Sequence, residues 1–253
     1  EAHGAAPGKQ YPRRLVAMAK ALGRIDADVL LLQEAEGAEV ACALARRAWP
    51  RSGWSCFGTG SSRAGGRDPF PQHVVAATRL EATARLLRPL DRRSAGPRAA
   101  LELSIEGAGG LTVTGVHLKS SRGASSHDDC GNARQRMGMA AALGSRYSGW
   151  SSVLVVGDFN VDPLDSGRGI YDRTDDILTS RGFARLCPTE GGCPSPTYRG
   201  ATSGASAIDL AFFRKGGRWR PGRVEVLSKA PHVSRSKLGS DHLPLVVTLG
   251  QSR

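Results

Sequence analysis

The stretch that decides the fold is "VVGDFNVDP", Val155 to Pro163. It ends an apolar run that begins at Val153, and it places an acid and an amide, Asp158 and Asn160, directly after a glycine. A short continuous apolar run bounded by turn-forming residues is typical of a buried strand. Polar groups at the end of such a strand predict a binding or catalytic site at the edge of a sheet.

The size and composition of the chain indicate one large globular domain. The chain has 253 residues, of which 40% are hydrophobic and 23% are charged. This balance is typical of folded rather than disordered proteins. The sequence holds no run of 18 or more apolar residues, so we expect no membrane-spanning helix.

The charge of the chain is strongly positive, with a formal net charge of +12 and a sequence pI near 10.2. Such a balance favours polyanionic partners, including nucleic acid, anionic lipid surfaces and phosphorylated small molecules. The basic residues are spread along the chain rather than gathered in a tail, so the same charge could serve solubility alone.

The five cysteines form no C-x-x-C pair and show no zinc-binding spacing. Cys187 and Cys193 flank the turn-like stretch "PTEGG", which a disulfide between them could close. We therefore predict a Cys187–Cys193 bridge and a secreted or extracytoplasmic protein. Reduced cysteines in a cytoplasmic protein are the alternative.

Strands and helices alternate along the whole chain, which predicts a single mixed α and β domain over residues 1–253. Helices are expected at residues 12–25, 38–49, 132–147 and 175–183. The expected strands cover residues 27–34, 73–80, 98–105, 111–120, 151–160, 206–214, 223–228 and 243–249.

Polar groups that could carry chemistry end or interrupt five of these apolar runs. Any one of them has an ordinary structural explanation, such as a turn acid, but five together favour a common site. These groups are Glu34, His117 with Lys119, Asp158 with Asn160, Asp209, and Asp241 with His242.

This set suits phosphoester chemistry. Carboxylate oxygens suit Mg²⁺, which keeps water and substrate oxygens among its ligands. A histidine held by an acid is a matched pair for proton transfer or charge stabilisation. No glycine-rich P-loop and no G-x-S-x-G motif is present, so the sequence favours neither nucleotide-triphosphate cycling nor serine-hydrolase chemistry.

The motifs "LLQE", "VHLKS", "VVGDFN", "SAIDLAFF" and "GSDHLPLVV" occur in this order between Leu31 and Leu249. In that order the chain resembles the endonuclease/exonuclease/phosphatase superfamily, which has the deoxyribonuclease I-like fold, and its secreted bacterial members in particular. The resemblance implies a four-layer α/β/β/α sandwich, in which two packed, mainly antiparallel sheets are flanked by helices.

The resemblance also implies the roles of four residues around a metal and a scissile phosphate. Glu34 resembles the metal-binding glutamate, and Asp241 the late aspartate that assists the metal. His242 resembles the histidine that contacts the phosphate, with Asp209 as its orienting acid. Mg²⁺ is the expected cofactor, with Mn²⁺ or Ca²⁺ as alternatives.

Five further residues follow from the same resemblance. Asp158 resembles the aspartate that positions or deprotonates the attacking water, and Asn160 the amide that holds a phosphoryl oxygen. His117 resembles the second active-site histidine of the deoxyribonuclease branch. Arg98 and Lys119 are expected to bind the substrate phosphates.

One departure concerns the start of the chain. Family members open with a strand that carries a metal-site asparagine, whereas residues 12–25 here already form the expected first helix. A sheet that lost a central strand would expose long hydrogen-bonding edges. Either the strand lies upstream of Glu1 or this member lacks it, and we favour a domain whose first strand lies upstream of Glu1 over a true deletion.

Within this superfamily the basic charge and the arginine-bearing polar loops favour a nuclease that acts on DNA or RNA. The alternatives are a small-molecule or lipid phosphoesterase and a catalytically degenerate module that binds polyanions. Aromatic residues are only 6% of the chain, which argues against stable membrane insertion. We expect a monomer.

Overall fold

The computed structural model describes most of the chain in nine segments. These are residues 10–59, 73–87, 98–107, 109–120, 130–163, 172–188, 196–200, 204–227 and 240–251.

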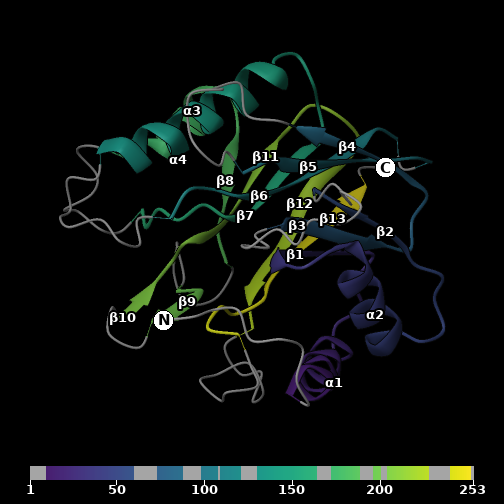
Figure 1. Ribbon diagram of the computed structural model, residues 1–253. Coiled ribbons are helices and arrows are strands. Elements are labelled where there is room, and N and C mark those ends of the chain that lie inside the picture. Colours follow the sequence, from purple (N-terminus) through teal and green to yellow (C-terminus); the bar gives the residue numbers. More distant parts are fainter. Residues whose placement is uncertain are drawn as a thin grey trace, which may run out of the picture.

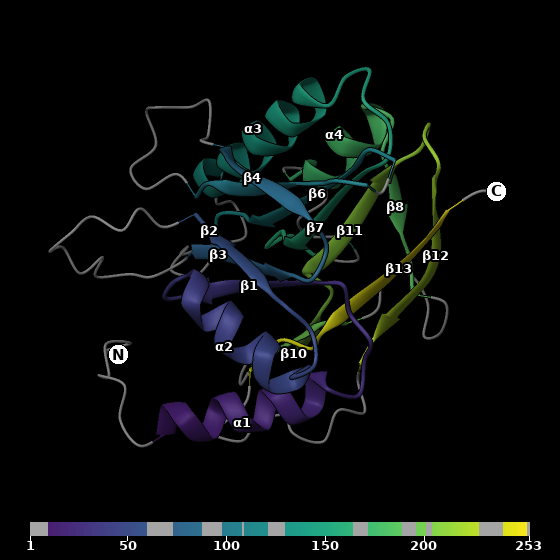
Figure 2. The ribbon, with the colours of Figure 1, turned by 90° about the vertical axis from the view of Figure 1, so that its right-hand side faces the viewer.

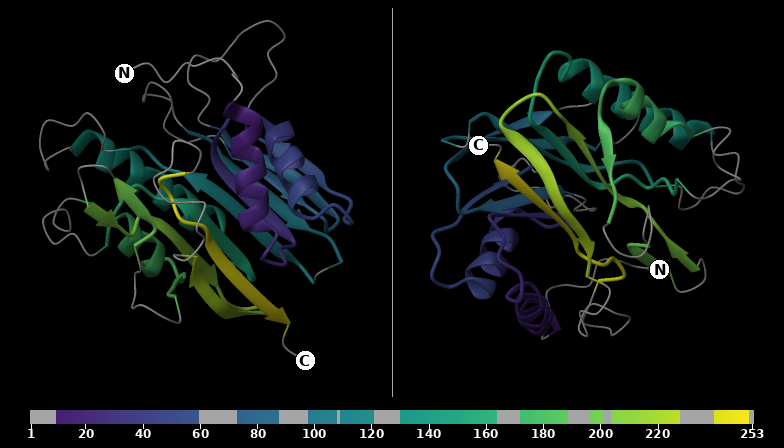
Figure 3. Two further views of the ribbon diagram at one scale, coloured as in Figure 1. Left: turned by 90° about the horizontal axis from the view of Figure 1, so that it is seen from below. Right: turned by 180° about the vertical axis from the view of Figure 1, so that it is seen from behind.

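The elements form four layers, with helices outside and sheets inside (Figures 1 and 2). Helices α3 (Cys130–Arg146) and α4 (Thr174–Ser180) cover one outer face. Helices α1 (Gln10–Leu22) and α2 (Ala38–Ala48) lie side by side on the opposite side of the molecule (Figure 3). The layered α/β fold implied by the sequence motifs is thereby confirmed. Among the described helices, none is both long and apolar enough to cross a membrane.

The larger sheet has six strands in the order β4-β5-β6-β7-β11-β8. Its strands are β4 (Ala82–Leu87), β5 (Ala100–Ile105), β6 (Leu111–His117), β7 (Val153–Asp158), β11 (Asp209–Arg214) and β8 (Ala184–Leu186). Four of the five pairings are antiparallel, and only β6 and β7 run parallel. Helix α3 connects these two strands, so the carboxyl ends of β6 and β7 lie at the same edge of the sheet.

The second sheet layer consists of two smaller sheets. A three-stranded sheet has the order β1-β3-β2, and β12 pairs with β13. The strands are β1 (Val29–Ala35), β2 (Ser55–Gly58), β3 (His73–Thr78), β12 (Trp219–Val226) and β13 (Leu245–Gln251). A separate small pair joins β9 (Tyr198–Gly200) to β10 (Gly204–Ser206).

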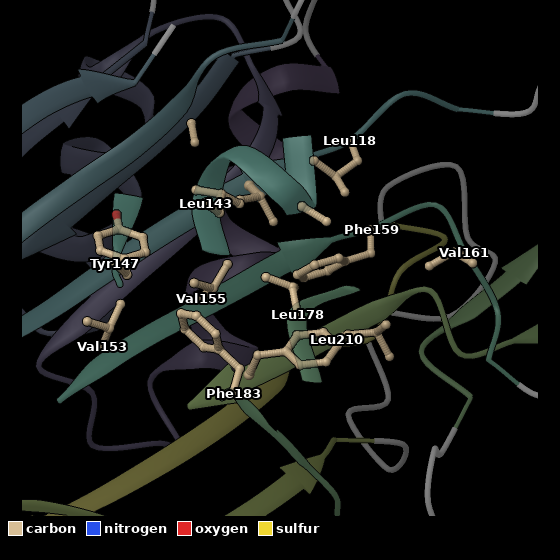
Figure 4. Close-up of a cluster of buried hydrophobic side chains, with 14 residues drawn as sticks. Leu118, Leu143, Tyr147, Val153, Val155, Phe159, Val161, Leu178, Phe183 and Leu210 are labelled. Carbon is tan, nitrogen blue, oxygen red and sulfur yellow. The ribbon is translucent and has the colours of Figure 1, made fainter. Parts of the chain in front are cut away.

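The three largest apolar cores among the described residues hold the layers together. The first lies between the six-stranded sheet and helices α3 and α4, and it includes Phe159, Phe183 and Leu178 (Figure 4). The second lies between the two sheet layers, where Leu103 and Phe213 are completely buried. The third lies between the β1-β3-β2 sheet and helices α1 and α2. Burial of this apolar surface is the main force that holds the layers in register.

The sheets approach each other closely at Gly115 of β6. A Cβ atom there would lie 2.8 Å from Val74 Cγ1 and 3.0 Å from Leu31 Cδ2. Real Cβ atoms essentially never show so short a contact, so a larger residue here would force Val74 or Leu31 to shift. The contact lies two residues before His117, and it therefore helps to place the end of β6 against β1 and β3.

Strands β1 and β13 each have one hydrogen-bonded neighbour among the described residues, β3 and β12 respectively. Both strands send apolar side chains into the core between the sheets, including Leu31 from β1 and Val247 from β13. An edge strand can accept a further strand. The expectations that residues 1–253 form a single domain and that its family's first strand lies upstream remain predictions.

The structure pairs two cysteines whose partners the sequence left open. Cys42 of α2 and Cys56 of β2 form a disulfide with Cα atoms 5.7 Å apart, a pairing that sequence spacing did not indicate. Cys130 is free and exposed. Cys187 is disulfide-bonded, but Cys193 lies outside the described residues, so the Cys187–Cys193 bridge remains a prediction, as does secretion.

Candidate active site

Three titratable side chains lie at adjacent positions across three neighbouring strands. His117, the last residue of β6, is in register with Asp158, the last residue of β7. Asp158 is in turn in register with Asp209, the first residue of β11. Side chains that are opposite one another on adjacent strands point to the same face of the sheet. The sheet therefore brings together three groups that are far apart in the sequence.

A fourth group, His242, joins this row from the segment before β13. Its Nδ1 atom donates a hydrogen bond to Oδ2 of Asp209 over 2.8 Å. Burial would lower the pKa of His242, but the hydrogen bond to Asp209 and the negative charges of Asp209, Asp158 and Asp241 outweigh it and raise the pKa to about 9. The imidazole is therefore positively charged at neutral pH.

The backbone around Thr197 fixes the relative position of His242 and Asp209. The hydroxyl of Thr197 accepts the backbone N–H of Asp209 at 2.9 Å, and its carbonyl accepts the N–H of Leu243 at 2.6 Å. The ring of Tyr198 lies against the imidazole of His242, with centroids 5.0 Å apart. Sequence reasoning missed Thr197 and Tyr198, because neither ends an apolar run.

Asp158 is almost completely buried at the centre of the row. Its Oδ1 atom accepts the backbone N–H of Asn160 at 2.8 Å. Burial and the nearby charge of Asp209 raise the pKa of Asp158 to about 7, against the opposing effects of His242, this N–H and Arg98. A carboxyl group with this pKa can take up and release a proton near neutral pH.

His117 differs from His242 in its charge. Its Nε2 atom lies 3.5 Å from Oδ2 of Asp158 and 3.9 Å from Oε1 of Glu34. Burial, together with the positive charges of Arg98 and His242, lowers the pKa of His117 to about 3. The two histidines of the site, His117 and His242, are therefore neutral and charged, respectively, at pH 7. Within the described part of the chain, Nδ1 of His117 has no hydrogen-bond partner.

The carbonyl oxygen of Leu118 joins two predicted site residues. It accepts one hydrogen bond from Nδ2 of Asn160 at 3.0 Å and another from Nη1 of Arg98 at 2.5 Å. The N–H of Leu118 also donates to the carbonyl of Asp158 at 2.8 Å. Asn160 has a left-handed backbone with φ of 52°, which asparagine tolerates better than most residues. The side chain of Lys119 is half-buried on the same segment.

Glu34 stands at the edge of the site with an unusual backbone. It lies within the irregular register of β1 between Leu32 and Ala35, and its φ is 55°. A non-glycine residue in this region costs about 1–3 kcal/mol and is enriched at functional sites. The carboxylate of Glu34 is exposed, with 68% of the side-chain surface accessible.

Glu34 and Asp241 are the two exposed carboxylates that the sequence assigned to a divalent metal. Burial lowers the pKa of Arg98, and the charge of Glu34 opposes this shift. The charge of Asp241 contributes to the raised pKa of His242. Mg²⁺ commonly binds through one or two carboxylates and fills its other positions with water and phosphate oxygens. Each side chain is of the type that this ion prefers. Among the residues that the structure describes, no group of three or more His, Cys, Asp or Glu side chains is arranged to hold a metal ion.

The structure brings most of the nine candidate residues of the sequence prediction together, with different degrees of contact. Hydrogen bonds or close charge contacts connect His117, Asp158, Asn160, Asp209, His242 and Arg98. Glu34 and Asp241 border them, and Lys119 is placed nearby through its backbone. Their roles in a reaction remain proposals.

Comparison with known proteins identifies the same family that the sequence motifs resemble. The model of the Endonuclease/Exonuclease/phosphatase family matches residues 2–242. No curated protein matches the sequence.

Solved structures share the fold at low sequence identity. A family protein from Leptotrichia buccalis has a TM-score of 0.66 at 14% identity, covering 99% of this chain and 97% of its own. The 3′ phosphatase NExo from Neisseria, bound to a product DNA hairpin, has a TM-score of 0.67 at 15% identity, covering 97% and 96%. Truncated Caenorhabditis elegans TDP2 has a TM-score of 0.61 at 15% identity, covering 94% and 90%. These likenesses establish the fold.

Proposed function

Because the chain belongs to the endonuclease/exonuclease/phosphatase family, whose model spans residues 2–242, we propose that it is a Mg²⁺-dependent phosphodiesterase that cleaves nucleic acid. The observation that carries this proposal is the row of His117, Asp158 and Asp209 across β6, β7 and β11, joined to His242 by a 2.8 Å hydrogen bond. The row combines a proton acceptor with a fixed positive charge.

In this proposal Asp158 is the base that takes a proton from the attacking water. Its pKa of about 7 leaves a substantial ionised fraction at neutral pH and still makes it a useful proton acceptor. His117 is neutral, and its Nε2 lies 3.5 Å from Asp158. It can therefore form a hydrogen bond with the same water without adding a positive charge beside it. The new P–O bond forms as the bond to the leaving oxygen breaks.

His242 stabilises the negative charge that develops on the phosphoryl group. It is protonated, and Asp209 on Nδ1 leaves Nε2–H to face the substrate. Positive groups that are already in place when charge develops contribute strongly to catalysis. The side-chain amide of Asn160 donates one N–H to the carbonyl of Leu118. Its second N–H can donate to a phosphoryl oxygen.

Glu34 and Asp241 would hold the metal. When bound, Mg²⁺ supplies Lewis-acid polarisation of a phosphoryl oxygen and orients the substrate. The exposure of Glu34 suits this role, because it leaves room for water and phosphate oxygens.

Nucleic acid is proposed as the substrate because of the net charge of +12 and because one neighbour by fold, NExo, was solved with a DNA hairpin. A polyanion bound through Z phosphates loses affinity with salt at a log–log slope of about −0.9Z on duplex DNA. A nucleotide monophosphate releases far fewer counterions, so its KM should vary much less with salt.

The test measures the KM and rate of hydrolysis of duplex DNA, RNA and a nucleotide monophosphate, with saturating Mg²⁺ and over a series of salt concentrations. EDTA and His242→Ala are the negative controls. We expect EDTA-sensitive cleavage of a polymer with a steep salt dependence of KM. Turnover of the monophosphate alone, with DNA and RNA intact, would instead support a small-molecule phosphatase. Salt-dependent DNA binding without any turnover would indicate a polyanion-binding module.

A further inference from the structure

An ion pair with both side chains buried lies outside the candidate site, between α3 and the segment before α4. It joins Arg136 to Asp172, and only 3% of each side chain is exposed. Nε and Nη2 of Arg136 both lie 2.6 Å from Oδ2 of Asp172. The other carboxylate oxygen of Asp172 accepts the N–H and the hydroxyl of Thr174, at the start of α4.

Another nitrogen of the guanidinium contacts the backbone next to the candidate site. Nη1 of Arg136 donates to the carbonyl oxygen of Lys119 at 2.7 Å. Lys119 follows Leu118, whose carbonyl holds Asn160 and Arg98 and whose N–H donates to the carbonyl of Asp158. A single peptide unit therefore separates the bond made by Arg136 from the bonds that place two proposed phosphate-binding side chains.

Stability alone does not account for this arrangement. Removing two charges from water is costly, and a buried ion pair replaced by apolar groups of similar size is often equally stable. A planar guanidinium, by contrast, offers donors in a fixed fork, so it can hold its acceptor oxygens in one geometry. The direction of these donors, toward Asp172 on one side and Lys119 on the other, favours a role in placing the backbone.

We propose that Arg136 and Asp172 are positioning residues, which hold the Leu118–Lys119 backbone so that Asn160 and Arg98 face the reacting phosphate. The catalytic part of this proposal rests on the proposed function. The positional part concerns the backbone alone and can be measured without a substrate.

The chain contains a matched control on the same helix. Arg146 forms a bidentate ion pair with buried Glu102, with Nε and Nη2 each 2.7 Å from a carboxylate oxygen. Glu102 pairs in register with Thr114, three residues before His117, which is about 10 Å away along a strand. This pair is similar in chemistry and in burial of the acid, but the hydrogen bonds of its guanidinium go to Glu102 rather than to the backbone of the candidate site.

The experiment compares two double variants, Arg136→Met with Asp172→Asn, and Arg146→Met with Glu102→Gln. The Asp172→Asn substitution keeps a side-chain oxygen that can accept the N–H and the hydroxyl of Thr174. A third variant, Arg136→Lys, keeps the charge but loses the fork, and it gives the same comparison if the first variant does not fold. For each variant we measure the hydrogen-exchange rates of the backbone amides of Leu118 and Asn160. We also measure the midpoint of thermal unfolding, kcat and KM.

We expect the amides of Leu118 and Asn160 to exchange faster in the Arg136 variants and at the wild-type rate in the Arg146 control. We also expect kcat to fall about a hundredfold, which is typical of a misplacement near 1 Å, while KM changes much less and Arg136→Lys loses less activity than the double variant. Unchanged exchange at both amides would overturn the proposal, as would an equal loss of kcat in the Arg146 control. If the wild type cleaves no phosphoester, the proposed function fails, but the exchange rates still decide the positional claim.

Discussion

Asp209 and His242 are 33 residues apart in the chain, yet Oδ2 of one lies 2.8 Å from Nδ1 of the other. The acid begins β11 and the histidine precedes β13, so the contact depends on the packing of the two sheet layers. It determines both the tautomer and the charge of the imidazole.

This contact predicts that the two residues act as one unit. His242→Ala removes the positive charge that faces the phosphate, and the rate should fall about 10²- to 10⁴-fold. Asp209→Asn should damage the same step, and the double variant should be little worse than the worse single variant. Single-turnover rates with circular dichroism as the folding control provide the measurement. Losses that add in full would show that the residues act independently.

The pH dependence of cleavage follows from the two raised pKa values. Asp158 must be ionised to accept a proton, so activity should rise as pH increases through its pKa of about 7. His242 must keep its proton, so activity should fall as pH increases through its pKa of about 9. We expect a bell-shaped profile of kcat/KM between these values. Asp209→Asn removes the hydrogen bond that raises the pKa of His242, so the upper limb should move to lower pH. An upper limb that stays in place would contradict the assignment to His242.

Glu34→Gln tests the proposed metal ligand. The substitution keeps the size of the side chain and removes its charge, so a metal held through Glu34 should bind more weakly. Cleavage should then require a much higher Mg²⁺ concentration or disappear. The measurement is the rate as a function of Mg²⁺ for wild type and variant. Glu36→Gln, at a neighbouring exposed carboxylate, is the control. Identical Mg²⁺ curves for Glu34→Gln and wild type would exclude the role.

The buried carboxylate of Glu102 predicts how stability depends on pH. Burial alone would raise its pKa, but hydrogen bonds from Arg146 and Tyr147 outweigh this and lower the pKa. A lowered pKa stabilises the folded state at pH values above the unfolded-state pKa, and this contribution is lost as pH falls through the folded-state pKa. Glu102→Gln should therefore be less stable than wild type at neutral pH, with a smaller difference in acid, below the folded-state pKa. Urea unfolding under both conditions measures this, and a difference independent of pH would refute it.

The sequence predicted the parts of the fold in which local pattern and burial agree. Strands β6 and β7 are largely apolar and end at a polar residue, and β11 is largely apolar and begins at one. Both the strands and the site at their ends could therefore be inferred. Strand β4 was missed because its side chains are mostly exposed at the edge of the sheet. Helix α1 was expected to reach Ile25 but ends at Leu22, just before Gly23.

The features that sequence reasoning missed depend on tertiary contacts. The disulfide between Cys42 and Cys56 joins α2 to β2, a strand too short to recognise by pattern. Arg136 and Asp172 meet only because α3 packs beside the segment before α4. No local spacing relates either pair, and the packing that creates them is set by the cores.

The most direct test of the central claim is cleavage of a labelled DNA or RNA oligonucleotide in water enriched in ¹⁸O, with mass analysis of the products. Water that attacks phosphorus with Asp158 as the base places its oxygen on the product phosphate. We predict one ¹⁸O atom per cleaved bond with Mg²⁺ in a single turnover, in the terminal phosphate of the fragment that keeps the phosphate, and no ¹⁸O in the fragment that ends in a hydroxyl. With EDTA or with Asp158→Asn we predict neither product nor label. Cleavage without ¹⁸O in the phosphate, or full labelling by Asp158→Asn, would contradict the account.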